Sequence, residues 1–391
     1  MFASSDAPRS GGAAVRIGIV DLMSLRPESM TRRVFAAAVA AGAARLGWRT
    51  TGFGAATGSP SASVASGRTA TGCASDESSA TCRPDGRPSE IRSEATGASP
   101  EEAAESEVAV TFFGIDPLRA SIDVDWPALA AMDALTISGS EPKAADIAAE
   151  PSLAVVDRIL RDCSGAASLL FSCQSAHAAL HLLHGLERHR LPYRAHGAFD
   201  HWVHGAALDR MGGVQPGAHP GTALVEGLAT PVRVTHSRWN AMTSADLREA
   251  GVDILLDSEE AEWHLATGPD GLRHVFLQGH PEYLPDTMAR EHRRDLRRWL
   301  SDPMRPFPAI PSRYFPHDTE QTLLDLAVRL RTTFDPTLLD GFPLPTHHSE
   351  VMADWTADAE VFFANWIRAV AQARSTSTTP AAPAPQPIPS I

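Results

Sequence analysis

The chain has 391 residues, of which 43% are hydrophobic, and its formal net charge is −13 at pH 7. This length fits either one large α/β domain with insertions or two domains. The negative charge argues against a nucleic-acid partner, because phosphate binding needs clustered Lys and Arg side chains.

The amino terminus and the cysteines indicate the compartment. The first fourteen residues are small and polar, unlike a secretory signal, and no apolar run reaches membrane-spanning length. We therefore predict a cytoplasmic protein with no membrane partner. The four cysteines (Cys73, Cys82, Cys163 and Cys173) show neither CxxC nor Cys/His spacing, which predicts no disulfide framework and no metal site. A single functional thiol is compatible with this set.

The chain opens with a predicted strand and helix. Residues 15–22 (VRIGIVDL) form a short, β-branched apolar run, and Phe35, Val39 and Leu46 follow at helical spacing. Residues 51–107 are rich in Ala, Ser, Gly and Thr and almost lack bulky apolar side chains. Such a segment cannot bury enough surface to offset its ordering entropy, so it is predicted to be a disordered insertion.

Strands and helices then alternate. Residues 108–115, 134–138 and 167–172 are apolar runs typical of buried strands, whereas residues 153–160 and 174–186 have helical spacing. Alternation of this kind implies parallel strand pairing. The fold class predicted is therefore α/β, with a doubly wound, mainly parallel sheet.

The second half adds strands within a β-rich excursion and a long helix. Residues 232–237, 252–258 and 274–280 are predicted strands, and residues 286–300 are a predicted helix. One side of that helix carries its apolar residues and a histidine: Met288, His292, Leu296 and Trp299. Four prolines between residues 303 and 311 should interrupt regular structure.

The ends of the chain differ in composition from its centre. A last helix is predicted at residues 357–370, followed by a Pro-rich tail. We expect one folded domain over residues 15–371, with disordered residues 1–14 and a disordered tail over residues 372–391.

Cys173 lies where an apolar strand meets an Ala-rich helix. Its sulfur should stand at the carboxyl edge of the sheet and face the helix amino terminus, where N–H groups and the helix dipole stabilise a thiolate and a later oxyanion. The alternative is a small buried core residue, the usual fate of a cytoplasmic cysteine. The local pattern leaves both interpretations open.

The segment GHPEY closes the strand of residues 274–280 and puts His280 at the same sheet edge as Cys173. A histidine beside a proline is often only the end of a strand. However, a cysteine nucleophile needs a base, and the base needs an orienting partner. His280 and Glu282 can supply both if Pro281 bends the chain, which predicts a catalytic triad with Cys173.

Several segments resemble, in order, those of the homoserine O-succinyltransferases of the methionine pathway. The opening VRIGIVDLM looks like that family's first strand. The other segments are FSCQSAHAAL at 171–180, THSRW at 235–239, GHPEY at 279–283, YFPH at 314–317 and FFANWI at 362–367. The resemblance covers most of residues 15–371, interrupted by the insertion, and makes this span an acyltransferase domain.

The resemblance implies a class I glutamine-amidotransferase-like (flavodoxin-like) fold and a ping-pong acyl transfer. Acyl-coenzyme A would acylate Cys173, and His280, held by Glu282, would then deprotonate the hydroxyl of homoserine or a related amino acid. No permanently bound cofactor is implied; succinyl-CoA or acetyl-CoA is the donor substrate. The family also implies a homodimer.

Two substrate-binding residues carry over from the resemblance. Ser237 matches a substrate-site serine, and Arg294 matches an arginine that grips the amino acid's carboxylate, a task that suits a guanidinium fork. Without the resemblance, Ser237 is interpreted as an ordinary turn serine. Arg294 is then interpreted as part of a solvated, arginine-rich helix face.

The chain also departs from the family. Arg194 stands where a lysine near the site is usual, and the early motif reads Asp21-Leu22-Met23-Ser24. Lys143 takes the position linked to the choice of acyl donor, with Glu141 inserted where alanine is usual. A lysine there can pair with a succinyl carboxylate, which favours succinyl-CoA over acetyl-CoA.

Other functions compete with this one. A glutamine amidotransferase uses the same Cys, His and Glu, but it needs glycines beside the nucleophile, and here Ser172 and Gln174 flank it. A non-catalytic relative that binds coenzyme A or an amino acid would fit the departures at Ser24, Lys143 and Arg194. Retention of Cys173, His280, Glu282 and Arg294 argues against it. An O-acyltransferase acting on serine or another hydroxy amino acid stays open.

Overall fold

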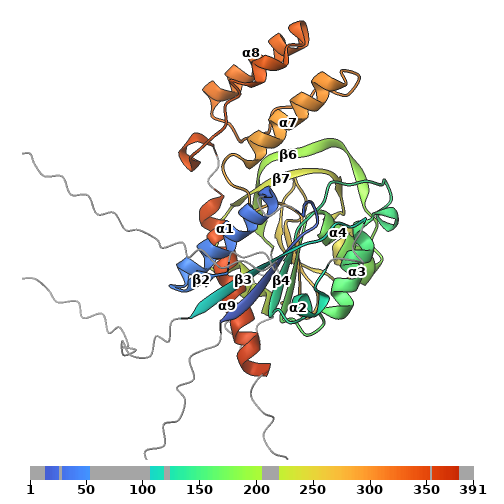
Figure 1. Cartoon of the computed structure of the whole chain (residues 1–391), viewed down its shortest axis with the longest axis vertical. Helices are drawn as coiled ribbons and strands as arrows, with labels where there is room; N and C mark the ends of the chain where they lie inside the picture. Colours follow the sequence, from blue (N-terminus) through green and yellow to red (C-terminus); the bar gives the residue numbers. More distant parts are fainter. Residues whose placement is uncertain are drawn as a thin grey trace, which may run out of the picture.

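The computed structural model describes six stretches of the chain, drawn in colour in Figure 1: residues 14–25, 29–52, 106–118, 124–204, 220–352 and 355–377. The disorder predicted for residues 1–14, for most of residues 51–107 and for the end of the tail falls almost wholly outside them. None of the described helices is both long and apolar enough to span a bilayer.

The buried apolar runs form a single mixed sheet, which has ten strands within the described residues. In sheet order they are β2 (Arg49–Thr51), β3 (Glu107–Gly114), β1 (Val15–Asp21), β4 (Ala134–Ile137), β5 (Ser168–Ser172), β10 (His274–Leu277), β9 (Leu265–Thr267), β8 (Asp253–Asp257), β6 (His189–Val203) and β7 (Val232–Ala241). The strands from β2 to β10 pair in parallel. The rest pair antiparallel. The predicted α/β class, mainly parallel sheet and β-rich excursion are confirmed.

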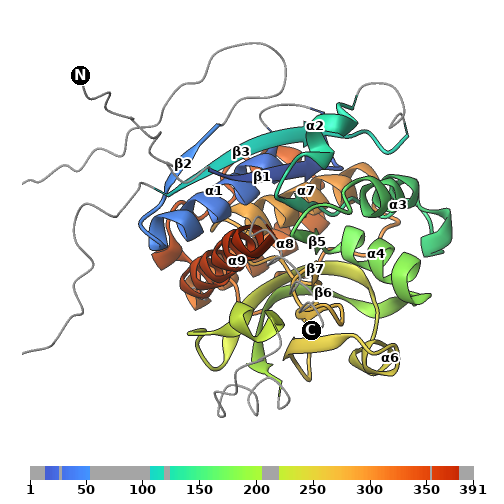
Figure 2. The same cartoon turned by 90° about the horizontal axis from the view of Figure 1, so that it is seen from below.

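Helices cover both faces of the parallel strands, as Figure 2 shows. One face carries α1 (Met30–Arg45) and α9 (Thr356–Ser377); the other carries α2 (Trp126–Ala130), α3 (Ser152–Asp162) and α4 (Gln174–His184). At Gly42 of α1, an added Cβ would lie 2.7 Å from Phe363 Cβ. Only glycine allows α1 and α9 to pack this closely, so both helices can bury their apolar faces.

A third core lies beside the sheet, where α7 (Thr287–Ser301) packs near α8 (His317–Thr333), at the top of Figure 1. The side of α7 predicted to be apolar is buried as expected. The remaining elements are short: α6 (Ser244–Glu249) and the 3₁₀ turns η1 (Ile147–Ala149), η2 (Pro220–Val225), η3 (Pro336–Leu339) and η4 (His348–Glu350).

Some predicted boundaries are wrong. Thr51 ends β2 and Glu107 begins β3, so the insertion predicted at residues 51–107 is too wide at both ends. Residues 372–377, predicted as tail, belong to α9. Arg374 holds this last turn, since its guanidinium donates to Ala14 O at 3.0 Å and lies 3.4 Å from Asp133.

Candidate active site

The turn between β5 and α4 holds Cys173 in an uncommon backbone conformation. Its φ is 53° and its ψ is −111°, a region that costs a non-glycine residue about 1–3 kcal/mol. Ser175 Oγ braces the turn, accepting from Ser172 N at 3.0 Å and donating to Ile137 O at 2.8 Å. Gly139 packs against it so closely that an added Cβ would lie 3.3 Å from Cys173 Cβ. The sulfur is therefore presented on a strained, tightly supported elbow, which is partly exposed.

His280 and Glu282 follow β10, the strand that pairs with β5. His280 Nδ1 lies 2.9 Å from Glu282 Oε1 and donates to this carboxylate, which leaves Nε2 for other partners. Both residues are buried. The Tyr283 ring stacks on His280 with centroids 4.4 Å apart, fixing the imidazole plane.

The electrostatics of His280 favour its protonated form. Burial opposes a charge on the ring, but the Glu282 carboxylate and a hydrogen bond to the Cys173 side chain outweigh burial and raise the pKa of His280 well above its usual value. Burial and the charge of Glu291 also raise the pKa of the Tyr283 phenol well above its usual range. The structure thus brings Cys173, His280 and Glu282 together.

A cavity of about 1310 Å³ opens over the elbow. Six of the seven predicted site residues line it: Cys173, His280, Glu282, Ser237, Arg194 and Arg294. Lys143 is not among the lining residues. Its side chain is 65% exposed, with Glu141 4.0 Å from its ammonium nitrogen. The β4–α3 loop is fixed with Lys143 outside the cavity lining because the backbone N–H groups of Lys143 and Ala144 donate to the buried Glu150 at 3.1 Å.

The predicted substrate-binding residues Arg194 and Ser237 belong to one polar network. Arg194 donates to Ser237 Oγ at 2.8 Å and also bonds Asp295, while Ser237 Oγ donates to Glu291. The guanidinium of Arg194 is therefore engaged with the protein's own carboxylates. Arg294 is freer, since its one hydrogen bond within the described part of the chain runs from Nε to Asp295 Oδ1 at 3.1 Å. Its side chain is 42% exposed towards the cavity.

Sequence reasoning missed Glu291. It accepts from Tyr283 Oη at 2.8 Å as well as from Ser237, and it lines the cavity. Glu291 lies three residues before Arg294 and hence on the same face of α7. That spacing, which puts a carboxylate and a guanidinium on one helix face, was the available signal.

Arg238 is a second residue that was missed. It is 5% exposed, lines the cavity, and has no carboxylate within 4.0 Å among the described residues. Its Nε donates to His236 Nδ1 at 3.4 Å; His236 Nε2 donates in turn to His201 Nε2 at 3.2 Å, and His201 Nδ1 donates to Phe199 O at 3.1 Å. These bonds fix both histidines as neutral tautomers. Burial lowers the pKa of Arg238 to about 10, so it keeps a positive charge beside Cys173.

A buried ion pair supports the elbow from behind. The side chains of Arg188 and Glu150 are 0% and 1% exposed, and Arg188 Nη2 donates to Glu150 Oε1 at 2.5 Å. Arg188 Nη1 also donates to Gln174 Oε1 at 2.7 Å, which holds the residue that follows Cys173. One arginine thus ties the β4–α3 loop to the first turn of α4.

Replacing Arg188 by methionine should lower the free energy of unfolding by about 3–5 kcal/mol, because it leaves Glu150 buried without its cation. Urea unfolding monitored by tryptophan fluorescence measures this loss. The matched control is Arg161→Met, which removes an exposed pair with Asp157 and should cost less than about 1 kcal/mol. Equal losses in the two variants would contradict the role of the buried pair.

Distant structural relatives exist among solved structures. The glutaminase domain of Trypanosoma brucei CTPS superposes with a TM-score of 0.39 and 11% identity, covering 69% of this chain and 87% of that one. A glutamine amidotransferase from Thermotoga maritima gives a TM-score of 0.36 at 13% identity, covering 67% and 87%. Likeness at this level carries no argument, and the α/β assignment rests on the strand order.

Sequence relatives are closer. A homoserine O-succinyltransferase of Methylorubrum extorquens is 35% identical over 243 residues, which cover 62% of this chain and 69% of the relative. One from Cardiobacterium hominis is 32% identical, covering 62% and 63%, and one from Bradyrhizobium japonicum is 32% identical, covering 68% and 74%. Part of each relative lies outside the match. The family model for homoserine O-succinyltransferase matches residues 128–376, well over half of the chain. The chain belongs to the homoserine O-succinyltransferase family.

Proposed function

We propose that this protein transfers a succinyl group from succinyl-CoA to the hydroxyl of homoserine through an acyl-thioester on Cys173. The observation that carries the proposal is the Glu282–His280 pair beside Cys173 in a large cavity, in a chain of this family. A thiol, an imidazole and a carboxylate close together support covalent acyl transfer, because a nucleophile needs a base and the base needs an orienting partner.

In the first half-reaction the Cys173 thiolate attacks the thioester carbonyl of the donor. The new C–S bond to Cys173 forms, the bond to the coenzyme A sulfur breaks, and the departing thiolate takes the proton from the His280 imidazolium. The raised pKa of His280 supports this starting state. The free N–H groups of the first turn of α4 lie beside the elbow and suit the transient oxyanion.

In the second half-reaction the acceptor hydroxyl attacks the acyl-thioester. His280 takes the hydroxyl proton on Nε2, because its Nδ1–H stays hydrogen-bonded to Glu282. The ester bond forms, the Cys173 thiolate leaves, and the starting thiolate–imidazolium pair is regenerated. No other proton donor or acceptor is needed.

The polar network suits an amino-acid acceptor. Arg294 presents nitrogens to the cavity for the carboxylate, and Glu291 on the same helix face offers an acceptor for the ammonium group. Arg194 binds Ser237, Glu291 and Asp295, which assigns it to positioning that network rather than to direct contact. Family membership, rather than Lys143, supports the succinyl donor.

The test is intact-mass spectrometry of protein mixed with succinyl-CoA in the absence of acceptor. Wild type should gain one succinyl group, and Cys173→Ala should gain none. Homoserine added next should discharge the adduct faster than serine does, and succinyl-CoA should load faster than acetyl-CoA. No adduct, or one that persists in Cys173→Ala, would sink the mechanism. Release of ammonia from glutamine would favour the amidotransferase instead.

A further inference from the structure

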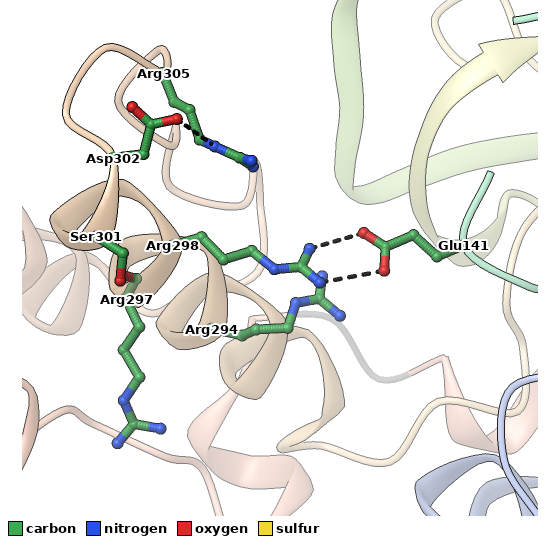
Figure 3. A pocket seen from close by; sticks show the side chains of 7 residues that line it. All are labelled: Glu141, Arg294, Arg297, Arg298, Ser301, Asp302 and Arg305. Carbon is green, nitrogen blue, oxygen red and sulfur yellow. Dashed lines mark hydrogen bonds and ion pairs between the residues drawn. The ribbon is translucent and has the colours of Figure 1, made fainter. Parts of the chain in front are cut away.

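A second hollow lies at the carboxyl end of α7, with a volume of about 480 Å³. We call it the arginine pocket; its lining residues are Glu141, Arg294, Arg297, Arg298, Ser301, Asp302 and Arg305. Figure 3 shows the guanidinium groups of Arg294 and Arg298 side by side, with Arg305 above them and Arg297 directed away. Three cations therefore converge on one space.

The charge of the arginine pocket opposes that of the whole chain. The lining includes two carboxylates and four arginines, three of which converge, whereas the chain has a net charge of −13. Arg298 binds Glu141 through two bonds of 2.9 and 3.2 Å, and Arg305 Nε donates to Asp302 at 3.2 Å. The Arg298 and Arg305 side chains remain 41% and 60% exposed, so an anion can reach both.

The arginine pocket adjoins the catalytic cavity. Glu141, Arg294, Arg298 and Arg305 line both hollows. Along α7, Arg298 lies seven residues beyond Glu291, which corresponds to about 10 Å of helix. Phe307 and Ile310 add apolar wall to the cavity. An elongated ligand can thus react at Cys173 and still touch the arginines.

We propose that the arginine pocket binds the phosphate groups of the acyl-CoA donor; this inference rests on the proposed function. Guanidinium forks match phosphate oxygens in pairs, and the long arm of coenzyme A holds its phosphates far from its sulfur. The carboxyl end of a helix repels phosphate, so the attraction comes from the arginine side chains themselves.

Glu141 competes with the phosphates for Arg298. The bond to Arg298 is the main cause that lowers the pKa of Glu141, so the carboxylate is charged and holds the guanidinium. Glu141 stands where the resemblance to the family leads us to expect alanine. Substitutions at the two ends of this bridge should therefore change donor binding in opposite directions.

The experiment compares two donors: succinyl-CoA and S-succinyl-N-acetylcysteamine, a thioester without phosphates. Arg298→Gln and Arg305→Gln should each raise KM for succinyl-CoA about tenfold, while Glu141→Ala should lower it severalfold. KM for the truncated donor should stay within about twofold in all three. The matched control is Arg161→Gln, an exposed arginine of α3 that lines neither hollow, and it should leave both values unchanged.

Three outcomes would overturn the inference: no change with either donor, equal changes with both donors, or wild type using the two donors with the same KM. In each of these the proposed function stands, because Cys173 is still acylated. If neither donor acylates Cys173 in wild type, the proposed function itself fails. Circular dichroism melting checks that the variants fold.

Discussion

Replacing His280 by asparagine is expected to lower kcat/KM for acyl transfer about a thousandfold, because both half-reactions pass a proton through its ring. Glu282→Gln should cost roughly a hundredfold or more, since it removes the charge that holds the imidazole tautomer and raises the pKa of His280. Steady-state kinetics with succinyl-CoA and homoserine give these ratios. Single-turnover acylation of Cys173, followed by mass, should slow in both variants.

Tyr283→Phe is the matched control for these two variants. It keeps the ring stacked on His280 and removes only the hydroxyl that donates to Glu291. It should therefore change KM for the amino acid more than it changes Cys173 acylation. If His280→Asn keeps kcat/KM within tenfold of wild type, His280 is not the base.

Lowering the pH from 7.5 to 5.5 is expected to remove most of the protein's stability. Burial lowers the pKa of eight histidines in the described part of the chain, and six of them are lowered far: His177 to about 3, His201 and His292 to about 4, and His196, His236 and His264 well below the usual value. Their unfolded forms titrate near 6.5, so below that pH the unfolded chain binds protons that the folded chain excludes.

The sign follows from this difference in proton binding. Stability is highest above about pH 7 and falls as the pH drops below 6.5, by up to about 1.4 kcal/mol per histidine per pH unit. Six such groups amount to roughly 8 kcal/mol at pH 5.5, which is comparable to the whole stability of a domain. His280 acts in the opposite sense, because its raised pKa stabilises the fold below pH 6.5 and that contribution fades as the pH rises through its folded pKa.

Urea midpoints measured at half-unit steps from pH 7.5 to 5.5 check this expectation. His177→Gln should reduce the slope below pH 6.5 by about one proton. The exposed His317→Gln serves as the control and should leave the slope unchanged. A midpoint that stays constant down to pH 5.5 would show that the buried histidines do not control acid stability.

The pairing of Cys173 with His280 could be predicted from sequence because each residue follows a buried apolar strand. The ends of neighbouring parallel strands meet at one sheet edge, so Cys173 and His280 had to be close once the topology was parallel. Because one side chain is a thiol and the other an imidazole, the residue types then limited the reactions that the pair could perform. No such strand-end pattern identifies the buried histidines His201, His236 and His264. They come from three different strand regions and show no local spacing.

Other features were hidden because long-range pairing decides them. The strand β6 contains Pro192 and many polar residues, and its pairing with β7 stabilises it despite that composition. The helix α8 follows a proline-rich stretch that obscured its buried residues Leu323, Leu326 and Leu330. The position of Lys143 depends on Glu150, which lies only seven residues further along the chain but whose burial no local pattern reveals.

The contact between Thr51 and Glu107 has a consequence for how this chain can tolerate change. Thr51 Oγ1 donates to Glu107 Oε1, and β2 pairs in parallel with β3, so the end of β2 and the start of β3 lie on neighbouring strands. A connection between these two points spans only the short gap between neighbouring strands, and each doubling of its length costs only about 0.6 kcal/mol of closure entropy. This edge of the sheet is therefore a natural grafting point, where a reporter or a whole second domain can be spliced in while the cavity on the far strands keeps its geometry.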